Sequence, residues 1–376
     1  MKITIIGPSY PYRGGIALFS NRLAESLSKA GHEVNIVTFK MQYPSFLFPG
    51  KTQFVTDKNG SDLNITRAIN SVNPFNWLKV GKQVSATKPD LVIFKYWMPF
   101  MAPCFGTIAK QIKKNKHTKI LGLVHNLIPH EKRTGDTALT SFFVKKMDGF
   151  IAMSKSVLAD IEKFDSAKPK VFSPHPLYDN FGEVKPREEA LKELDLDGQY
   201  NYMLFFGIVR KYKGLDLLLN AFADKNLNNG KIKLIVAGEF YDDNTAYLDI
   251  IKKHQLEDSV ILRSTFIPDA EVGNYFCAAD IIVQPYRNAT QSGVTQIAYH
   301  FNKPMLVTDV GGLKEIVPHD KVGYVVQPNE KAVAKALIDF YQNDRAAEFI
   351  AGAIEEKKKY SWQKLVDTIN SLYQNV

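Results

Sequence analysis

The sequence predicts an α/β protein made of two domains, each a doubly wound parallel sheet with helices on both faces. Short apolar runs alternate with amphipathic stretches along the chain, as expected where each parallel strand is followed by a helical crossover. Segment 174–188, which contains several prolines, interrupts this alternation. The length of 376 residues and the 45% share of apolar residues are enough for two cores. We expect two sheets that face each other across an interdomain cleft.

The first domain, residues 1–180, should contain five strands rich in Ile, Val and Phe. These are residues 2–6, 33–39, 91–96, 120–125 and 149–153. Residues 16–30 are amphipathic at helical spacing and predict the crossover helix between the first two strands.

The second domain, residues 181–360, repeats the same order of strands and helices. Its predicted strands are residues 202–206, 232–237, 260–262, 281–283, 304–308 and 323–325. Ligands of such sheets bind at the carboxyl ends of the strands, so functional residues are sought directly after each strand.

The composition excludes several classes of protein. Only Cys104 and Cys277 occur, without metal-ligand spacing or a disulfide framework, which fits a reducing compartment. The start of the chain lacks the features of a signal peptide, and no apolar run approaches the roughly 20 residues that span a bilayer. We therefore expect a cytoplasmic protein.

Part of the formal net charge of +9 comes from two clusters of lysines. Five lysines fall within residues 110–119, and Lys145 and Lys146 follow the apolar residues 142–144. Lysines beside exposed aromatic residues favour peripheral contact with an anionic membrane, such as the inner face of the cell membrane, and a simply solvated helix face remains the alternative. No signature of nucleic-acid binding is present.

Residues 205–216 are the most informative stretch of the chain. They join an apolar strand to a helix through a turn that contains Arg210, Lys213 and two glycines. The amide-rich start of the helix and the cations favour the same ligand, a phosphate or diphosphate. The alternative is a solvated basic turn.

The first predicted strand is followed by a different loop. Gly14 and Gly15 precede the helix at 16–30, but the loop lacks the G-x-G-x-x-G pattern of a dinucleotide-binding turn. The two glycines would let the backbone approach a ligand closely, or they form a plain strand-to-helix turn. This loop argues against a dehydrogenase.

Taken in order, these motifs resemble the family 4 glycosyltransferases, which have the GT-B fold of two Rossmann-like domains. The motifs are Gly14-Gly15, His125-Asn126, Gly207–Asp216, Ala237-Gly238-Glu239, Ala279–Pro285 and Lys303–Val317. The resemblance spans nearly the whole chain and includes residues 361–376, which look like the family's C-terminal helix that packs back on the first domain.

The resemblance implies that the second domain binds a nucleotide-diphosphate sugar and that the first receives the acceptor. Arg210 and Lys213 would hold the donor diphosphate and stabilise the charge that grows on it. The matching histidine of relatives, His125 here, lies near the donor sugar, and Asn126 follows it. One departure is that Ile208 occupies the position where arginine usually follows the glycine.

A larger departure concerns the paired glutamates that contact the donor in relatives. Residues 288–300 contain neither, so those two roles cannot be transferred to this chain. A loop of small residues remains, with Ser292, Gly293, Val294 and Thr295 opening a helix, and Gln291 is a neutral stand-in for a carboxylate. The alternatives are that this loop only packs or that transferase activity has been lost.

The remaining candidates are weaker. Gly312 would keep its loop thin for close approach of the ligand, and Glu239 and Glu315 could contact the nucleotide or cap helix amides. The Asp195-Leu196-Asp197 triplet precedes the strand at 202–206, far from these loops. We therefore expect no metal and no cofactor, because Arg210 and Lys213 can replace a divalent cation.

The resulting hypothesis is a metal-independent retaining glycosyltransferase that acts in synthesis of bacterial envelope polysaccharide. Its acceptor would be a saccharide or a lipid-linked saccharide. Two alternatives of other classes stay open: a sugar-nucleotide epimerase of the same fold, and a non-catalytic protein that binds nucleotide sugars or glycans.

Overall fold

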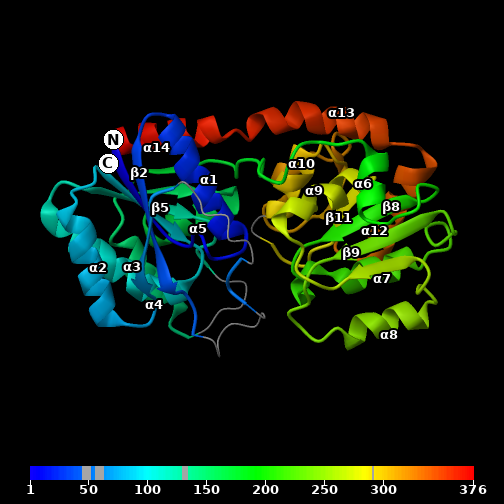
Figure 1. The fold of residues 1–376 in the computed structure, drawn as a ribbon, viewed down its shortest axis with the longest axis horizontal. Helices are drawn as coiled ribbons and strands as arrows, with labels where there is room; N and C mark the ends of the chain where they lie inside the picture. Colours follow the sequence, from blue (N-terminus) through cyan, green and yellow to red (C-terminus); the bar gives the residue numbers. More distant parts are fainter. Residues whose placement is uncertain (45–51, 56–62, 129–133, 290–291) are drawn as a thin grey trace. The chain divides into compact units, whose positions relative to one another are not determined.

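The computed structural model describes residues 1–44, 52–55, 63–128, 134–289 and 292–376. The chain divides into two compact units (Figure 1). Unit 1 consists of Met1–His175 together with Trp362–Val376, and unit 2 consists of Pro176–Ser361.

Unit 1 contains a seven-stranded parallel sheet with the order β3-β2-β1-β4-β5-β6-β7. Its strands are β1 (Lys2–Ile6), β2 (Glu33–Met41), β3 (Ile65–Asn70), β4 (Leu91–Tyr96), β5 (Lys119–Val124), β6 (Gly149–Ala152) and β7 (Lys170–Phe172). Its helices are α1 (Gly15–Lys29), α2 (Pro74–Ala86), α3 (Ala102–Ile112), α4 (Asp136–Val144), α5 (Lys155–Phe164) and α14 (Trp362–Gln374).

Both faces of this sheet are covered by helices. Helices α2, α3 and α4 pack side by side on one face, and α1 and α14 pack together on the other (Figure 1). Strand β4 is buried at every position, and Val92, Phe94 and Tyr96 point into the core beneath α3 and α4. Because neighbouring strand residues point to opposite faces, Lys95 points toward α1.

Unit 2 contains a six-stranded parallel sheet with the order β10-β9-β8-β11-β12-β13. Its strands are β8 (Asn201–Phe206), β9 (Ile232–Ala237), β10 (Val260–Arg263), β11 (Ile281–Gln284), β12 (Met305–Thr308) and β13 (Gly323–Val326). Its helices are α6 (Arg187–Glu193), α7 (Leu215–Phe222), α8 (Thr245–Lys253), α9 (Asp269–Ala278), α10 (Gly293–His300), α11 (Leu313–Ile316), α12 (Glu330–Gln342) and α13 (Ala346–Glu356).

Helix α7 packs against α8 and α12 on one face of the second sheet, and α6 packs against α9 (Figure 1). The core beneath α7 includes Phe205, Leu218, Phe222 and Leu337, all at most 1% exposed. The doubly wound α/β architecture predicted from the sequence is thereby confirmed for each unit.

The eleven predicted strands are all present with small shifts at their ends, but the sequence analysis missed β3 and β7. Both are edge strands of the first sheet. Two of the residues of β3 are exposed, so the strand lacks a continuous apolar run, and β7 has only three residues. Short or polar edge strands carry a weak hydrophobic pattern, which explains the omission.

Candidate functional site

The carboxyl edge of the second sheet brings together the loops that follow β8, β9, β11 and β12, as the order of strands requires. Most of the residues predicted to bind the donor lie in these loops. Hydrogen bonds connect these loops to each other.

The loop after β8 is a tight turn whose geometry requires glycine. Gly207 has φ +94°, and Gly214, with φ +69°, ends the short 3-10 helix Lys211–Lys213 and begins α7. A Cβ at Gly214 would lie 2.1 Å from the carbonyl oxygen of Pro285, in the loop after β11. The turn after β8 is therefore fitted closely against its neighbouring loop.

Arg210 and Lys213 lie in this turn and are close enough to interact. Lys213 is partly buried, with Nζ 5.6 Å from the centroid of the Tyr286 ring. Burial, with a smaller contribution from the charge of Arg210, lowers the pKa of Lys213 from 10.5 to about 8. Arg210 is exposed, and its guanidinium lies 5.7 Å from the centroid of Tyr241.

Neither of these two cations forms an ion pair with a carboxylate within the described ranges. The nearby Arg287 differs, because it makes an ion pair of 2.7 Å with Asp216. Two neighbouring cations that have no ion-pair partner repel each other, and an anion bound between them would relieve that repulsion. The turn therefore has the electrostatics of a diphosphate site.

The loop after β9 is bonded to the β8 turn through the backbone. The amide of Val209 donates to the carbonyl of Glu239 at 2.8 Å, and the amide of Tyr241 donates to the carbonyl of Val209 at 3.1 Å. Gly238 has φ +148°, and a Cβ there would lie 2.1 Å from the carbonyl oxygen of Gly207. Glu239 is 7% exposed, and its backbone carbonyl links this loop to the turn that carries Arg210.

The loop after β11 leads into α10. Ser292 caps the helix, because its hydroxyl accepts a hydrogen bond of 3.2 Å from the amide of Val294. Val294 also approaches Gly207, whose Cβ would lie 3.8 Å from Cγ2 of Val294. Thr295 is fully buried and donates to the carbonyl of Ser292, so its hydroxyl stabilises the first turn of α10. Gln291 lies outside the described residues.

Two further candidates follow β12, which is the neighbour of β11. Gly312 is buried and begins the four-residue helix α11, and Glu315 is exposed on that helix. The hydroxyl of Thr308, at the end of β12, donates to the carbonyl of Tyr286 and ties this loop to the one after β11. These residues therefore lie on the same edge of the sheet as Lys213.

Two buried glutamines near this edge were missed by the sequence analysis as binding residues. Gln284 ends β11 and Gln296 lies in α10, and they are 1% and 0% exposed. The amide oxygen and nitrogen of both side chains have no hydrogen-bond partner among the residues that the structure describes. A polar residue inside an apolar strand or helix was the available signal, since buried polar groups normally find partners.

In unit 1, the candidates lie at the carboxyl ends of β1 and β5. Gly14, with φ +102°, and Gly15 are exposed at the start of α1. His125 directly follows β5 and is 7% exposed. Asn126 comes next, and its Oδ1 is buried without a hydrogen-bond partner in the described part of the chain.

His125 belongs to a buried group of aromatic and basic side chains. Its Nε2 lies 2.5 Å from Nζ of Lys95, which is completely buried in β4. Phe19 packs against both, with Nζ of Lys95 3.3 Å from its ring centroid and the His125 ring at 4.9 Å. His175 and Trp362 contact the same phenylalanine at 4.7 and 5.0 Å between centroids.

The pKa values of both basic groups are displaced. Burial lowers the pKa of Lys95 well below its ordinary value. Burial, followed by the charges of Lys95 and His175, lowers the pKa of His125 well below 6.5. His125 is therefore held in its neutral form, which can both donate and accept hydrogen bonds.

Other sequence expectations lie outside this site. His130 and Glu131, two weaker candidates that follow His125, lie outside the described residues. Asp195 and Asp197 follow α6 and precede β8, at the opposite edge of the second sheet. Within the described ranges, no group of three or more His, Cys, Asp or Glu side chains could hold a metal ion.

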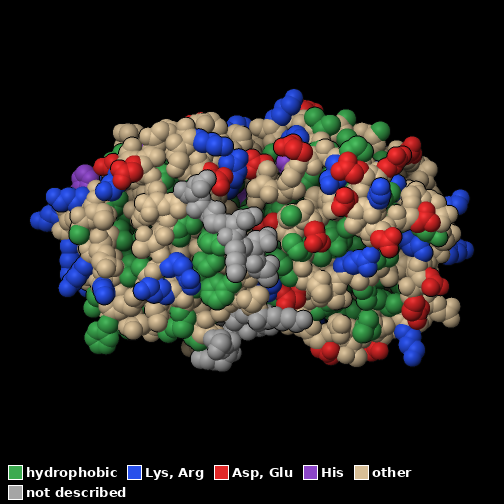
Figure 2. Space-filling model, viewed as in Figure 1, with side chains coloured by type: hydrophobic (Ala, Val, Ile, Leu, Met, Phe, Trp, Pro, Cys, Tyr) green, Lys and Arg blue, Asp and Glu red, His purple; other side chains and the backbone are tan. Residues whose placement is uncertain are grey.

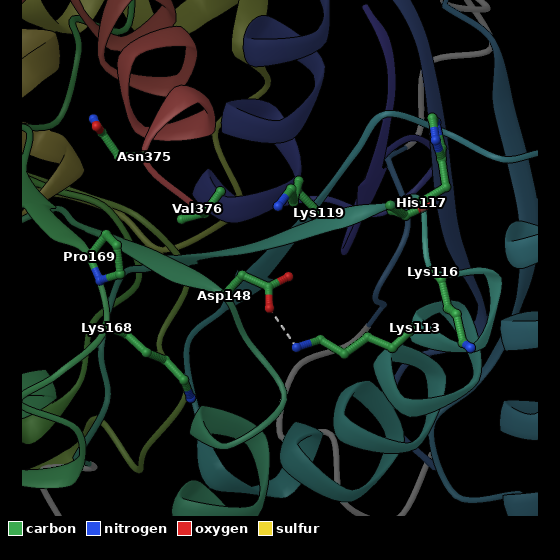
Figure 3. Close-up of a pocket in the computed structure, with 10 residues that line it drawn as sticks. Lys113, Lys116, His117, Lys119, Asp148, Lys168, Pro169, Asn375 and Val376 are labelled. Carbon is green, nitrogen blue, oxygen red and sulfur yellow. Dashed lines mark hydrogen bonds and ion pairs between the residues drawn. The ribbon is translucent and has the colours of Figure 1, made fainter.

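Part of the basic segment 110–119 lines a different hollow. A cavity of about 550 Å³ at the amino ends of β5 and β6 is lined by Lys113, Lys116, Lys119 and Lys168, among others. Lys113 points to Asp148 and forms an ion pair of 2.6 Å (Figure 3). This cavity lies at the edge of the first sheet opposite to His125.

The expectation of exposed aromatic residues beside Lys145 and Lys146 applies only in part to Phe142, which is half-buried with the Lys146 amine 5.6 Å from its ring centroid. Phe143 and Val144 are at most 1% exposed, because they pack into the core between α4 and the sheet. The exposed large apolar side chains described in unit 1 are Phe54, Val72, Phe75 and Leu78, and Phe75, in the first turn of α2, is 84% exposed. Lysine and arginine side chains gather along the left margin of the visible face, over unit 1 (Figure 2). Among the described helices, none is long and apolar enough to cross a membrane.

Comparison with known protein families gives two matches that cover most of the chain. Residues 13–174 match the model described as Glycosyltransferase Family 4, and residues 186–359 match the model described as Glycosyl transferases group 1. An uncharacterised glycosyltransferase of Methanocaldococcus jannaschii is 24% identical over 379 residues, which covers 100% of this chain and 99% of the relative.

Solved structures give the same result for the fold. The sucrose-phosphate synthase of Thermosynechococcus elongatus superposes with a TM-score of 0.77 at 17% identity, covering 100% of this chain and 99% of its own. HepE of Anabaena in complex with UDP gives a TM-score of 0.77 at 14% identity, with 100% of both chains covered. At these identities the likeness concerns the fold alone.

Proposed function

Because the chain belongs with the family 4-like glycosyltransferases of GT-B fold, we propose that it transfers a sugar from a nucleotide-diphosphate sugar to a saccharide or lipid-linked saccharide. Unit 2 binds the donor and unit 1 receives the acceptor. The anomeric configuration of the sugar is retained, and no metal takes part.

The observation that carries this proposal is the pair of cations in the turn after β8. The charge of Arg210 acts on Lys213, and neither side chain forms an ion pair with a carboxylate of the described residues. A diphosphate supplies the missing negative charge, and more of it develops as the bond to the sugar breaks. Stabilising that charge lowers the barrier directly. HepE, which shares the fold, has been solved with UDP and with UDP-glucose, which supports a nucleotide sugar as donor.

The chemistry needs no nucleophile from the protein. The bond between the anomeric carbon and the diphosphate oxygen breaks, and the acceptor oxygen bonds to the same carbon on the same face. The proton of the acceptor hydroxyl passes to the leaving phosphate. His125, held neutral, orients the donor sugar by hydrogen bonding, and the amides at the start of α10 meet oxygens of the donor.

A role at the inner face of the cell membrane in envelope polysaccharide synthesis follows as part of the proposal. Phe75, in the first turn of α2, and Val72, just before the helix, are exposed apolar residues, and Lys79 and Lys82 are exposed on α2. Apolar side chains beside lysines suit the surface of an anionic leaflet, where a lipid-linked acceptor would be found.

The test begins with a panel of nucleotide sugars screened by thermal shift, since a bound donor raises the melting temperature. Donors that bind are then assayed for slow hydrolysis and for transfer to saccharide and lipid-linked acceptors, with and without EDTA. Transfer that survives EDTA supports the proposal. Epimerised donor in the absence of acceptor favours the epimerase, and binding without hydrolysis or transfer favours the non-catalytic protein.

Substitutions in the turn after β8 test whether the donor diphosphate binds there. Alanine at both Arg210 and Lys213 should abolish donor binding and turnover, whereas Lys225→Ala, on an exposed loop of unit 2, should leave both unchanged. Normal donor affinity and turnover in the double variant would mean that the diphosphate binds elsewhere.

A further inference from the structure

Lys95 is an unusual residue for its place in the fold. It is the last residue but one of β4, between β1 and β5 in the sheet, and its side chain is completely buried. Its packing is tight, because a Cβ on Gly7, at the end of β1, would lie 2.7 Å from Cβ of Lys95. The aliphatic stem therefore has little freedom to move.

A buried lysine normally needs a carboxylate, and no ion pair of Lys95 is found within the described ranges. Its amine contacts Nε2 of His125 at 2.5 Å and the face of Phe19 at 3.3 Å. Two basic nitrogens at this separation cannot both carry an extra proton, because the two charges would be buried side by side. The pair instead shares a hydrogen bond, whichever nitrogen donates it.

Histidines that act on substrates are commonly oriented by a carboxylate, which raises the basicity of the ring. A lysine amine instead lowers the basicity of the ring, and it still fixes one ring nitrogen through a hydrogen bond. The contact at Nε2 fixes the rotation of the ring, and Phe19 packs edge-on against it at 4.9 Å.

We propose that Lys95 is a positioning residue, which holds the His125 ring in a single orientation and in its uncharged form so that it can serve the donor sugar. This inference rests on the proposed function, because it assigns Lys95 a part in the same reaction. Lys95 touches no substrate, and it acts through His125.

The test is Lys95→Met, which keeps an apolar stem of similar length and removes the amine. Replacing a buried amine by an apolar group of similar shape should leave the melting temperature unchanged or raise it. The kcat of sugar transfer or donor hydrolysis should fall about tenfold. Affinity for UDP should not change, because Arg210 and Lys213 lie in unit 2. Lys119→Met, at the amino end of β5, is the matched control and should leave kcat unchanged.

A double-mutant cycle separates positioning from a merely structural role. Adding Lys95→Met to His125→Ala should cause no further loss of kcat if Lys95 acts through the histidine. An equal loss in both backgrounds, or a normal kcat in Lys95→Met, overturns the inference while the proposed function stands. A wild-type protein that neither binds UDP nor turns over any nucleotide sugar overturns the proposed function itself, and the role of Lys95 with it.

Discussion

The lowered pKa of Lys213 leads to a prediction about the pH dependence of donor binding. With a pKa of about 8, the ammonium form is about 90% populated at pH 7 and about 10% at pH 9. The pKa lies below the ordinary value of 10.5, so the cation is lost earlier than usual as the pH rises. If the diphosphate binds the charged form, the affinity for UDP should fall about tenfold between these two pH values, or about 1.4 kcal/mol.

Isothermal titration calorimetry with UDP at pH 7 and pH 9 measures this change. Lys213→Arg stays charged throughout and should lose the pH dependence that comes from this residue. Lys213→Met should bind UDP about 10- to 100-fold more weakly at pH 7, the usual cost of losing a charge-assisted hydrogen bond. Ionisation of UDP itself is common to all variants, so Lys213→Met reports that background.

The contribution of Arg210 can be tested with the same assay. Its charge helps to lower the pKa of Lys213, so Arg210→Gln should move the fall in affinity to higher pH as well as weaken binding. If wild type and Lys213→Met show the same loss of affinity between pH 7 and pH 9, Lys213 does not titrate beside the diphosphate, and the reasoning is refuted.

Three further predictions concern the surrounding structure. Gly214→Ala should lower the free energy of unfolding by about 2–4 kcal/mol, because the new Cβ would meet the Pro285 carbonyl. The control Gly230→Ala, at a glycine with φ +77° and open space around it, should lower it by about 1 kcal/mol. Equal losses for the two variants in urea denaturation would contradict this. Ser292→Ala should cost about 1 kcal/mol in the same assay through loss of the α10 cap, and no loss would show that the cap does not stabilise the fold. Phe75→Asp should reduce sedimentation with anionic liposomes while Leu248→Asp, exposed in unit 2, should not, and equal binding would exclude α2 as the contact.

The sequence was sufficient for the architecture because each parallel strand buried on both faces leaves a continuous apolar run. Strand β9 is predicted at its observed bounds, Ile232–Ala237, for this reason. The same logic places Arg210 and Lys213, since a turn between strand and helix must lie at the carboxyl edge. The edge strand β3 was not predicted, because two of its side chains are exposed and interrupt the apolar run.

The partners of each site residue could not be predicted in the same way. Lys95 interrupts an apolar strand, yet nothing local shows that it meets His125, thirty residues later in the sequence, across two adjacent strands. The buried amides of Gln284 and Gln296 present the same difficulty, because the absence of a partner is a property of the packed core. The sequence pattern gives burial and the place along the sheet edge, whereas hydrogen bonding depends on side-chain geometry.

Two groups of basic side chains have been described, Arg210 with Lys213 and Lys95 with His125. They differ in what could offset the free-energy cost of placing positive charge there. In the turn after β8, Lys213 keeps contact with solvent and lies beside Arg210, so an incoming diphosphate can raise its pKa again and draw a proton onto it. Lys95 is fully enclosed by Phe19, His125 and the backbone near Gly7, and no anion can reach it without opening the core. Lys213 is therefore suited to change its charge when substrate binds. Lys95 is suited to keep its charge state, and that of His125, constant through the reaction.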